Sequence, residues 1–356
     1  MTAATTGTGG APVESRSRTL GIDVEVAGVV DETADARTIR FRLPDGIEQR
    51  PGQFVTIRIP SDRTGSVARS YSLSTAPGVD DVPAVTIKRV ADGYGSNWLC
   101  DNISEGDVLH IIAPSGVFTP HSWDHRLTLF AAGSGITPVM SILRSALELH
   151  TCPVTLFYAN RDRPSTIFAD ELDRLVARHP ERLRVHHWRE DSDGLPTADA
   201  VAPLCAAARG EVAGGEVFVC GPAPFMDLVE REALAAGVPH TDLHIERYVS
   251  LTGDPFTLSV ADEGSAPCAL TVHIDGSVTE IGCATTTPLL DAMLSEGIDA
   301  PYSCREGDCG SCVARLVSGT VDHGNGIALE PEDIDDGYLL ACQATPRSAE
   351  VEIEIE

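Results

Sequence analysis

The stretch Cys304-Arg305-Glu306-Gly307-Asp308-Cys309-Gly310-Ser311-Cys312 lies near the C-terminus, and Cys342 follows its last residue after a long gap. The spacing C-x4-C-x2-C with a distant fourth cysteine is typical of a plant-type [2Fe–2S] cluster, which is held by four thiolates. Gly307 and Gly310 allow the loop to wrap closely around the sulfurs, because glycine adopts backbone angles that other residues avoid. Their N–H groups can also donate to the ligand sulfurs and so tune the reduction potential of the cluster. The sequence therefore predicts four cluster ligands: Cys304, Cys309, Cys312 and Cys342.

A structural zinc site and a set of free buried cysteines are the alternative interpretations of this stretch. Zinc sites built from four cysteines usually contain two C-x2-C pairs, and this stretch contains one. The pattern therefore favours the iron–sulfur cluster. Since such a cluster carries one electron, we expect the rest of the chain to contain the source of that electron.

The length of 356 residues predicts two or three domains. The net charge of −27 predicts a protein that nucleic acid and anionic membranes repel. Residues 256–356 carry 19 acidic residues against 3 arginines and no lysine, a net of −16. This concentration serves solubility alone, or it forms a docking face for a positively charged partner; the sequence leaves both interpretations open.

The cysteines, the N-terminal segment and the apolar runs indicate where in the cell the protein is located. The cysteines outside the cluster stretch show no disulfide framework, which together with the cluster indicates a reducing environment. Residues 1–18 lack an apolar core, so we expect a disordered arm and not a signal peptide. The longest apolar run, residues 127–149, is interrupted by Gly133 and Pro138 and carries Arg144, which argues against a membrane span. We therefore expect a soluble, cytoplasmic protein without nucleic-acid or membrane partners.

Residues 19–122 are predicted to form a small antiparallel β-barrel, because short alternating segments recur between turn signals. One helix is expected at Tyr94–Asp101. Arg69 and Tyr71 would share one face of a strand, and Gly95-Ser96 would open the helix, whose N-terminus can bind an anion. By residue type alone, an ordinary Arg–Tyr pair and a plain helix cap are the commoner explanations. The predicted strands are Ile22–Val30, Thr38–Leu43, Phe54–Ile59, Ser70–Ser74, Val85–Val90 and Val108–Ala113.

Residues 123–248 change to strand–helix alternation, which predicts a parallel sheet of a nucleotide-binding kind. The turn Gly133-Ser134-Gly135-Ile136-Thr137-Pro138 departs from the dinucleotide fingerprint, because Pro138 replaces the third glycine. Cys220-Gly221-Pro222 follows another strand, where ligands bind in open α/β sheets. A lone cysteine at such a position is more often a core residue. The predicted strands are Leu127–Ala132, Val154–Tyr158, Leu183–Trp188, Glu216–Val219 and Leu243–Ile245, and the predicted helices are Val139–His150, Phe168–Arg178 and Ala223–Ala235.

Residues 249–264 contain clusters of turn residues and are predicted to be a linker. Residues 265–356 are predicted to be a small α+β domain of the β-grasp type around the cluster loop. Its predicted elements are a hairpin of Ala269–Ile274 and Val278–Ile281, a helix at Leu289–Glu296, and strands at Arg315–Ser318 and Tyr338–Cys342.

These segments resemble known families. The cluster stretch resembles the chloroplast-type ferredoxins. Arg69-Ser70-Tyr71-Ser72-Leu73-Ser74-Thr75, followed by the Gly-Ser helix start, resembles the flavin domain of the ferredoxin–NADP reductase superfamily. That resemblance implies that Arg69 pairs with the flavin phosphate, Tyr71 packs on the isoalloxazine, and Ser72 hydrogen-bonds near its reactive nitrogen. Gly95 and Ser96 would hold the diphosphate.

The Gly133–Pro138 turn together with Cys220-Gly221-Pro222 resembles the nicotinamide domain of the same superfamily. The resemblance implies that Thr137 and Cys220 flank the nicotinamide, Glu246 lies near the reactive edge of the flavin, and Tyr248 covers its ring. By residue type alone, Tyr248 is a core or interface aromatic. The expected catalytic residues are Ser72, Thr137, Cys220 and Glu246. The expected cofactor-binding residues are Arg69, Tyr71, Ser72, Leu73, Ile87, Lys88, Gly95, Ser96, Gly133, Gly135, Ile136, Thr137, Pro138, Cys220, Gly221 and Tyr248.

The expected cofactors are FAD, NADH and the [2Fe–2S] cluster. The Ser-Thr ending of the flavin motif resembles FAD-using members more than FMN-using ones. Asp162 would suit a free ribose 2′-hydroxyl, whereas Arg161 could meet a 2′-phosphate. The resemblance favours NADH over NADPH. A flavin is needed because it takes two electrons from a nicotinamide and releases them singly.

The whole chain, in the order flavin, nicotinamide and ferredoxin domain, resembles the reductase components of multicomponent oxygenases. Pro51-Gly52-Gln53-Phe54 and the segments at residues 63–69, 93–100 and 113–116 resemble most the reductases of bacterial 3-ketosteroid 9α-hydroxylases. This implies an NADH-dependent enzyme that passes electrons to a terminal oxygenase of the Rieske type acting on a steroid. Composition and spacing say nothing about the steroid.

Two other functions are compatible with the sequence. The reductase could serve another acceptor, such as a phenylacetyl-CoA epoxidase, an aromatic-ring oxygenase or an alkane hydroxylase. The cluster domain could instead be a redox sensor or binding module that the other domains gate. Rapid NADH oxidation with an artificial acceptor distinguishes a reductase from a sensor.

Overall fold

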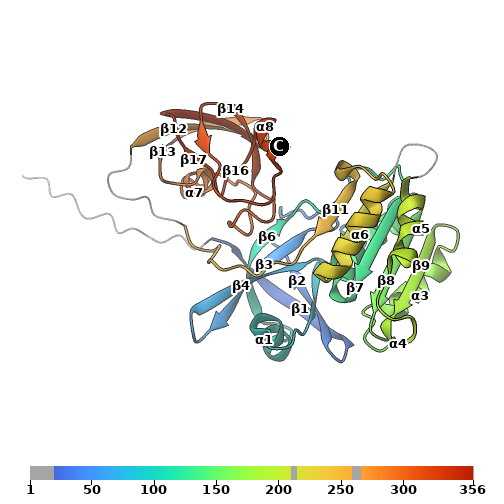
Figure 1. The fold of residues 1–356 in the computed structure, drawn as a ribbon. Helices are drawn as coiled ribbons and strands as arrows, with labels where there is room; N and C mark the ends of the chain where they lie inside the picture. The colour runs from blue at the N-terminus through green and yellow to red at the C-terminus, as the bar shows by residue number, and fades with distance from the viewer. Residues whose placement is uncertain (1–19, 210–214, 259–265, 356) are drawn as a thin grey trace, which may run out of the picture.

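The computed structural model describes residues 20–209, 215–258 and 266–355. The expected arm at residues 1–18 and part of the expected linker lie outside these ranges. Three large sheets, each with its own core, follow one another along the chain: an antiparallel barrel, a parallel sheet covered by helices, and a mixed sheet beside the cluster loop (Figure 1). This is the fold class that the sequence predicted.

The barrel is a six-stranded antiparallel sheet of order β4-β3-β6-β1-β2-β5. A bridge between Leu73 and Val85 connects its two edge strands and closes it. Strand β4 begins five residues before the predicted strand, because Gly65–Arg69 pair with the second half of β3. The elements are β1 (Ile22–Thr33), β2 (Ala36–Arg42), β3 (Phe54–Ser61), β4 (Gly65–Ser72), β5 (Ala84–Lys88), α1 (Tyr94–Asn102) and β6 (Val108–Ser115).

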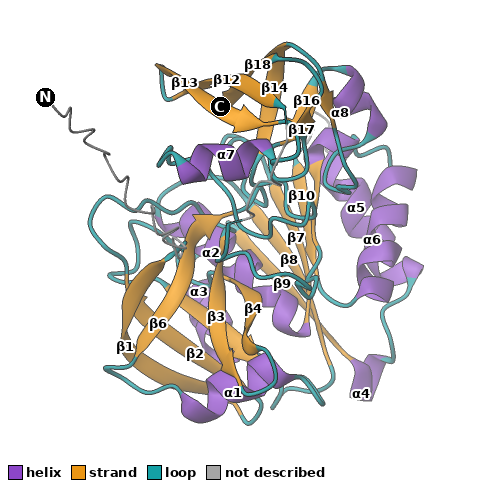
Figure 2. Ribbon diagram, turned by 90° about the vertical axis from the view of Figure 1, so that its left-hand side faces the viewer, coloured by secondary structure: helices purple, strands orange, loops and turns teal. Residues whose placement is uncertain are grey.

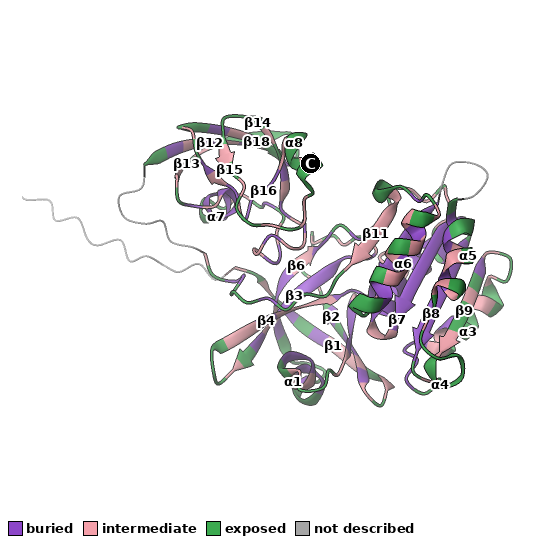
Figure 3. Cartoon of the chain, viewed as in Figure 1, coloured by how far each residue is buried: buried purple, intermediate pink, exposed green. Residues whose placement is uncertain are grey.

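The parallel sheet has the order β11-β10-β7-β8-β9. Every residue of β7 and β8 is buried, as expected for parallel strands with helices on both faces (Figure 3). Its elements are β7 (Leu127–Ala132), η1 (Gly133–Gly135), α2 (Ile136–Glu148), β8 (Val154–Asn160), α3 (Ala169–Arg178), β9 (Leu183–Arg189), α4 (Glu190–Asp193), α5 (Ala198–Arg209), β10 (Glu216–Cys220), α6 (Ala223–Ala235), η2 (His240–Asp242) and β11 (Leu243–Glu246).

Helices α2, α4 and α5 of this domain differ from the sequence prediction. Helix α2 begins at Ile136, three residues before the predicted start, so Pro138 lies in its first turn. Proline is tolerated there because the first backbone N–H groups of a helix have no intrahelical partner. The short helix α4 and helix α5 were not predicted. Helix α5 contains Pro203 and buries only three residues on one side, Val201, Cys205 and Ala208.

The third sheet has the order β13-β12-β18-β14-β16, with β12 and β18 parallel at its centre. Helix α7 packs on this sheet, as in the predicted β-grasp arrangement (Figure 2). Strand β18 was not predicted, although its sequence alternates strictly between glutamate and an apolar residue. The elements are β12 (Pro267–Ile274), β13 (Ser277–Ala284), α7 (Leu289–Ser295), β14 (Val313–Ser318), β15 (Val321–Asp322), α8 (Pro331–Asp335), β16 (Tyr338–Leu340), β17 (Thr345–Pro346) and β18 (Glu350–Ile355).

Among the described residues, no helix is both long and apolar enough to cross a membrane.

Candidate functional site: three adjoining centres

The four predicted ligand cysteines come together in the third domain. The side chain of Cys304 contacts that of Cys309, and the side chain of Cys312 contacts that of Cys342. The distant ligand is brought in by the backbone, because the N–H of Ala341 donates to the carbonyl of Cys312 over 2.9 Å. The amide of Gln343 further donates to the Cys342 sulfur at 3.6 Å.

The loop around these sulfurs supplies N–H groups as well as thiols. The N–H of Glu306 donates to the Cys304 sulfur at 3.4 Å. Hydrogen bonds from the Cys309 thiol and from neighbouring N–H groups lower the pKa of Cys304 to about 6. Gly307 is left-handed at φ +84°, and a Cβ there would lie 2.6 Å from the Cα of Gly326. Four converging thiols with N–H groups around them fit a [2Fe–2S] cluster.

The predicted flavin residues gather where β4 meets α1. The Cβ of a side chain at Gly95 would lie 3.0 Å from the Cγ of Arg69 and 3.5 Å from the Tyr71 hydroxyl, so only glycine lets the helix approach β4 this closely. Arg69 donates to the carbonyls of Ala68 and Leu251 and has no acidic partner in the part of the chain that the structure describes. A cation without an acidic partner beside a helix N-terminus fits a flavin diphosphate. Burial raises the pKa of Tyr71.

The turn Gly133–Pro138, which is predicted to bind the nucleotide, lies at the point where the strand order of the parallel sheet reverses. Strand β7 lies between β8 and β10, and the turn after β7 therefore faces the end of β10. A Cβ at Gly135 would lie 2.1 Å from the carbonyl oxygen of Cys220, so the two backbones approach as closely as glycine permits. The hydroxyl of Tyr158 supports the turn by donating to the carbonyl of Gly133 over 3.1 Å. Nucleotides bind in the crevice at such switch points.

The hydroxyl of Tyr248 joins the barrel to the parallel sheet. It lies 3.3 Å from the Ser72 hydroxyl and 3.0 Å from the Thr137 hydroxyl, and it also contacts the Cys220 thiol. The Tyr248 side chain is half exposed, but its hydroxyl points inward, and desolvation raises the pKa of Tyr248. Four of the predicted site residues, more than 170 positions apart at the extremes, therefore meet at one point.

Glu246 lies on the same edge of the sheet, since β11 pairs with β10 so that Glu246 is opposite Cys220. Burial raises the pKa of Glu246 to about 8, and burial likewise raises the pKa of Cys220. A carboxyl group that keeps its proton at neutral pH can donate a hydrogen bond to a bound ring system.

Other predicted cofactor-binding residues do not contact the Tyr248 hydroxyl among the described residues. Leu73 and Ile87 are in the barrel core, and Ile136 and Pro138 are buried in α2. Gly221 packs against Ala132, where a Cβ would lie 2.9 Å from the alanine methyl. Ser96 caps a turn by accepting from the N–H of Val90 over 3.1 Å.

Charged residues that were expected to bind a cofactor are engaged with the protein itself: Arg161 and Asp162, expected at the adenosine ribose, and Lys88. Arg161 and Lys88 both pair with Asp35, at 3.1 and 3.8 Å. Asp162 accepts from the N–H of Ser165, and this hydrogen bond lowers the pKa of Asp162.

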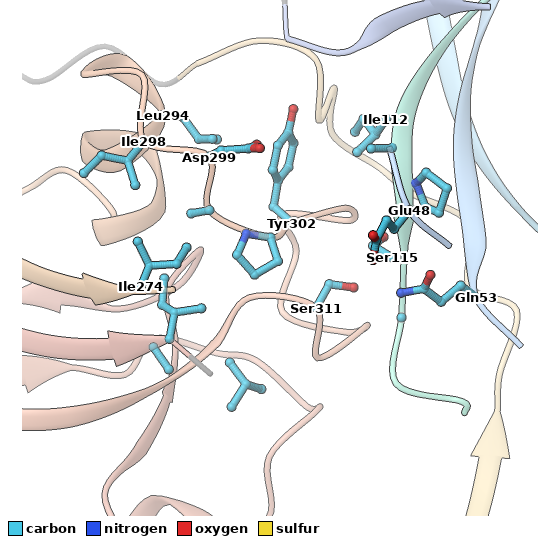
Figure 4. A pocket seen from close by; sticks show the side chains of 18 of the residues that line it. Glu48, Gln53, Ile112, Ser115, Ile274, Leu294, Ile298, Asp299, Tyr302 and Ser311 are labelled. Carbon is cyan, nitrogen blue, oxygen red and sulfur yellow. The ribbon is translucent and has the colours of Figure 1, made fainter. Parts of the chain in front are cut away.

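A cleft of about 850 Å³ separates the barrel from the cluster domain (Figure 4). Gln53 and Ser115 line its barrel side, and Tyr302 and Ser311 line the opposite side. Ser311 belongs to the cluster loop, so this loop forms part of the cleft wall that faces the barrel.

A second group of potential metal ligands lies at the opposite end of β10. His121, Glu216 and His244 place their ligand atoms within 4.8 Å of one another. The Glu216 carboxylate already accepts from the backbone N–H groups of His121 and Ser122 and from the His244 ring. Although burial opposes ionisation, these hydrogen bonds hold the pKa of Glu216 below its usual range. The Glu216 carboxylate therefore has protein hydrogen-bond partners and connects the segment of His121 and Ser122 to β11.

The residues that hold the cluster domain against the barrel were not predicted from the sequence. Ser303 hydrogen-bonds Thr56 across the domain boundary at 2.8 Å, and Glu306 and Arg305 bind the segment that was expected to be a linker. No local pattern distinguishes these residues from ordinary loop residues.

Three family models match successive parts of the chain. An oxidoreductase FAD-binding domain matches residues 23–119, an oxidoreductase NAD-binding domain residues 129–231, and a 2Fe-2S iron-sulfur cluster binding domain residues 272–347. The zinc interpretation of the four cysteines is thereby overturned in favour of the cluster.

Relatives match the chain over nearly its full length. The chain is 50% identical to the ferredoxin reductase component of 3-ketosteroid-9-alpha-monooxygenase from Rhodococcus rhodochrous, over 96% of this chain and 99% of that protein. It is 32% identical to one of the subunits of 1,2-phenylacetyl-CoA epoxidase from Escherichia coli, over 93% of this chain and 96% of that protein. Phthalate dioxygenase reductase shares the fold, with a TM-score of 0.55 and 24% identity over 94% of this chain and 98% of that chain.

Proposed function

Because the chain belongs to the family of oxygenase reductases that includes the ferredoxin reductase component of 3-ketosteroid-9-alpha-monooxygenase, we propose that it supplies electrons to a Rieske-type oxygenase that hydroxylates a steroid. Its general activity follows from the family: the chain is an oxidoreductase with FAD, NADH and a [2Fe–2S] cluster that serves a terminal oxygenase. The Rieske type and the steroid are the proposed part.

The three groups together supply the chemistry that divides a two-electron hydride into single electrons. Within the proposal, Arg69 and the α1 N-terminus hold the flavin phosphates, while Tyr71 and Ser72 orient its ring. The turn at Gly133–Gly135 holds the nicotinamide nucleotide at the sheet edge. Thr137, Cys220 and Glu246 line the place where the two rings meet.

The observation that supports this arrangement is the position of Tyr248. Its hydroxyl fills the junction between Ser72 of the barrel and Thr137 of the parallel sheet. Hydride transfer needs the reacting atoms of the nicotinamide and the flavin to lie about 3–3.5 Å apart. The two rings must therefore meet at the boundary between the two domains, and Tyr248 occupies this boundary. We infer that Tyr248 leaves this position when the two rings stack.

An anaerobic titration with NADH tests the electron path. With released flavin identified as FAD, bleaching of the flavin should be accompanied by the EPR signal of a reduced [2Fe–2S] cluster. Flavin bleaching without the signal would refute the coupling. Reduction by NADPH and not by NADH would mean that Arg161 reads a 2′-phosphate.

Reconstitution tests the partner. Mixed with NADH, a purified Rieske-type steroid oxygenase and a 3-ketosteroid, the reductase should support formation of the hydroxylated steroid. Support of a diiron epoxidase acting on phenylacetyl-CoA, without support of the steroid oxygenase, would assign the chain to the alternative system. The relative identities of 50% and 32% favour the steroid system.

The proposal includes a reducing, cytoplasmic compartment, in keeping with cysteines that form no disulfide among the described residues.

A further inference from the structure

Residues 248–257, here called the strap, connect the parallel sheet to the cluster domain and touch all three centres. Tyr248 begins the strap at the junction of Ser72 and Thr137. The sequence predicted a linker from residue 249 onward, but Leu251 and Phe256 are buried. The strap is therefore packed in place as far as it is described.

The strap is fixed to the barrel by three kinds of contact. The carbonyl of Leu251 accepts from Arg69 at 3.3 Å, which ties the strap to the arginine expected at the flavin phosphate. Asp254 pairs with Arg58 at 3.2 Å. The ring of Phe256 is fully buried beside His110, with ring centroids 5.1 Å apart. The strap thus takes its position from the flavin domain.

The cluster loop grips the same strap through two consecutive residues. One carboxylate oxygen of Glu306 accepts from the N–H of Thr252 at 2.8 Å, from the Thr252 hydroxyl at 2.7 Å and from the N–H of Gly253. Arg305 donates to the carbonyls of Pro255 and Thr257. Both residues follow the ligand Cys304 directly, and Glu306 donates its own N–H to the Cys304 sulfur.

The backbone of the loop is strained where it makes this grip. Arg305 is left-handed at φ +57°, a conformation that crowds the Cβ of any non-glycine residue. Such strain persists where the surroundings impose it, and it concentrates at functional positions. Here the surroundings are the strap carbonyls and the buried carboxylate of Asp291, which pairs with Arg305.

We propose that Glu306 is a positioning residue for electron transfer: by binding the strap, it fixes the ligand loop of the cluster at a set distance and orientation from the flavin. The inference rests on the proposed electron path from flavin to cluster. The Glu306 carboxylate binds the strap and not a cluster ligand; it acts through the strap on one side and through the Cys304 loop on the other.

The contact is suited to positioning more than to stability. Thr252 and Gly253 are exposed, and hydrogen bonds to exposed charges add little to global stability. Removing the carboxylate should therefore leave each domain folded while the cluster domain gains freedom relative to the barrel. Because electron transfer slows as the donor and the acceptor move apart, a cluster domain that is held less firmly should accept the electron more slowly.

The test compares Glu306→Ala with Glu280→Ala in the full-length holoenzyme. Glu280 is an exposed carboxylate on β13 with no hydrogen bond or ion pair among the described residues, so its removal reproduces the charge change alone. Anaerobic stopped-flow absorbance resolves flavin reduction by NADH from the later reduction of the cluster. We expect Glu306→Ala to slow cluster reduction severalfold, while the rate of flavin reduction by NADH stays close to wild type. Glu280→Ala should change neither phase.

The outcomes separate this inference from the proposed function. Unchanged cluster reduction in Glu306→Ala, or equal slowing of both phases, would overturn the role of Glu306. Failure of the wild type to reduce its cluster would instead overturn the electron path. If Glu306→Ala lacks the EPR signal of an assembled cluster, Thr252→Val decides the matter, because it removes one donor to Glu306 without touching the cluster loop. Thr252→Val should slow cluster reduction severalfold, and a rate equal to wild type would refute the proposal.

Discussion

Substitution of Gly135 by alanine is expected to damage the nucleotide site by sterics alone. Gly135 has ordinary helical angles, φ −61° and ψ −8°, so alanine meets no backbone strain there. Its Cβ would lie 2.1 Å from the carbonyl oxygen of Cys220, 2.3 Å from the Cys220 carbonyl carbon and 2.7 Å from the N–H nitrogen of Gly221. All three are backbone atoms, which cannot rotate away as a flexible side chain would.

The geometry sets the size of the effect. Real Cβ atoms essentially never approach closer than 3.0 Å, so the turn after β7 and the end of β10 must separate by about 0.9 Å, the difference from 2.1 Å. Forcing a methyl group into a packed region costs about 1–3 kcal/mol. A shift of about 1 Å in the groups that position a substrate can cost about 100-fold. We therefore expect kcat/KM for NADH to fall about 10- to 100-fold.

The assay is steady-state reduction of ferricyanide by NADH, which requires the nucleotide and flavin sites but not the oxygenase. Denaturant unfolding of the same samples measures the loss of stability. Gly282→Ala is the matched control, because nothing lies within 4 Å of a Cβ at Gly282. A Gly135→Ala enzyme whose kcat/KM and stability both lie within about twofold and 0.5 kcal/mol of the control would refute the steric reasoning.

Three other perturbations have defined outcomes. Burial raises the pKa of Glu246 to about 8, so the folded protein keeps a proton that the unfolded chain releases at about pH 4.3. The stability that this group contributes is therefore present at low pH and is lost as the pH rises towards 8. Glu246→Gln should remove this decrease in the free energy of unfolding between about pH 5 and 8, as measured by denaturant unfolding. Cys342→Ser should abolish the [2Fe–2S] EPR signal while ferricyanide reduction by NADH stays within about twofold of wild type, and a retained signal would mean that another residue is the fourth ligand. The net charge of −16 over residues 256–356 should steer association with a basic partner. The second-order rate constant of electron transfer to the oxygenase should then fall as salt shortens the Debye length from about 10 Å at 0.1 M to about 3 Å at 1 M. A rate constant independent of salt would contradict steering.

Local patterns were sufficient for most elements and for the cluster. Helix α6 has the predicted bounds, and the barrel strands were each found because alternation and turn residues act over a few positions. Strand β18 carried the same signal and could have been found from it. Helix α5 could not be found with the same ease, because an internal proline and a narrow buried side weaken its periodic pattern.

The sequence by itself determined the chemistry of this protein: the spacing of four cysteines, the flavin motif on β4 and the glycine turn after β7 are each short enough to be read locally. Only the tertiary structure decided how these parts meet. The contact of Tyr248 with Ser72 and Thr137 joins positions 176 and 111 residues apart, and the grip of Glu306 on the strap joins positions 54 apart. Such contacts depend on how three separate cores pack against one another, and hydrogen bonds between loops leave no periodic pattern in the chain. For this reason the expected linker became, in the folded protein, the segment that connects all three centres.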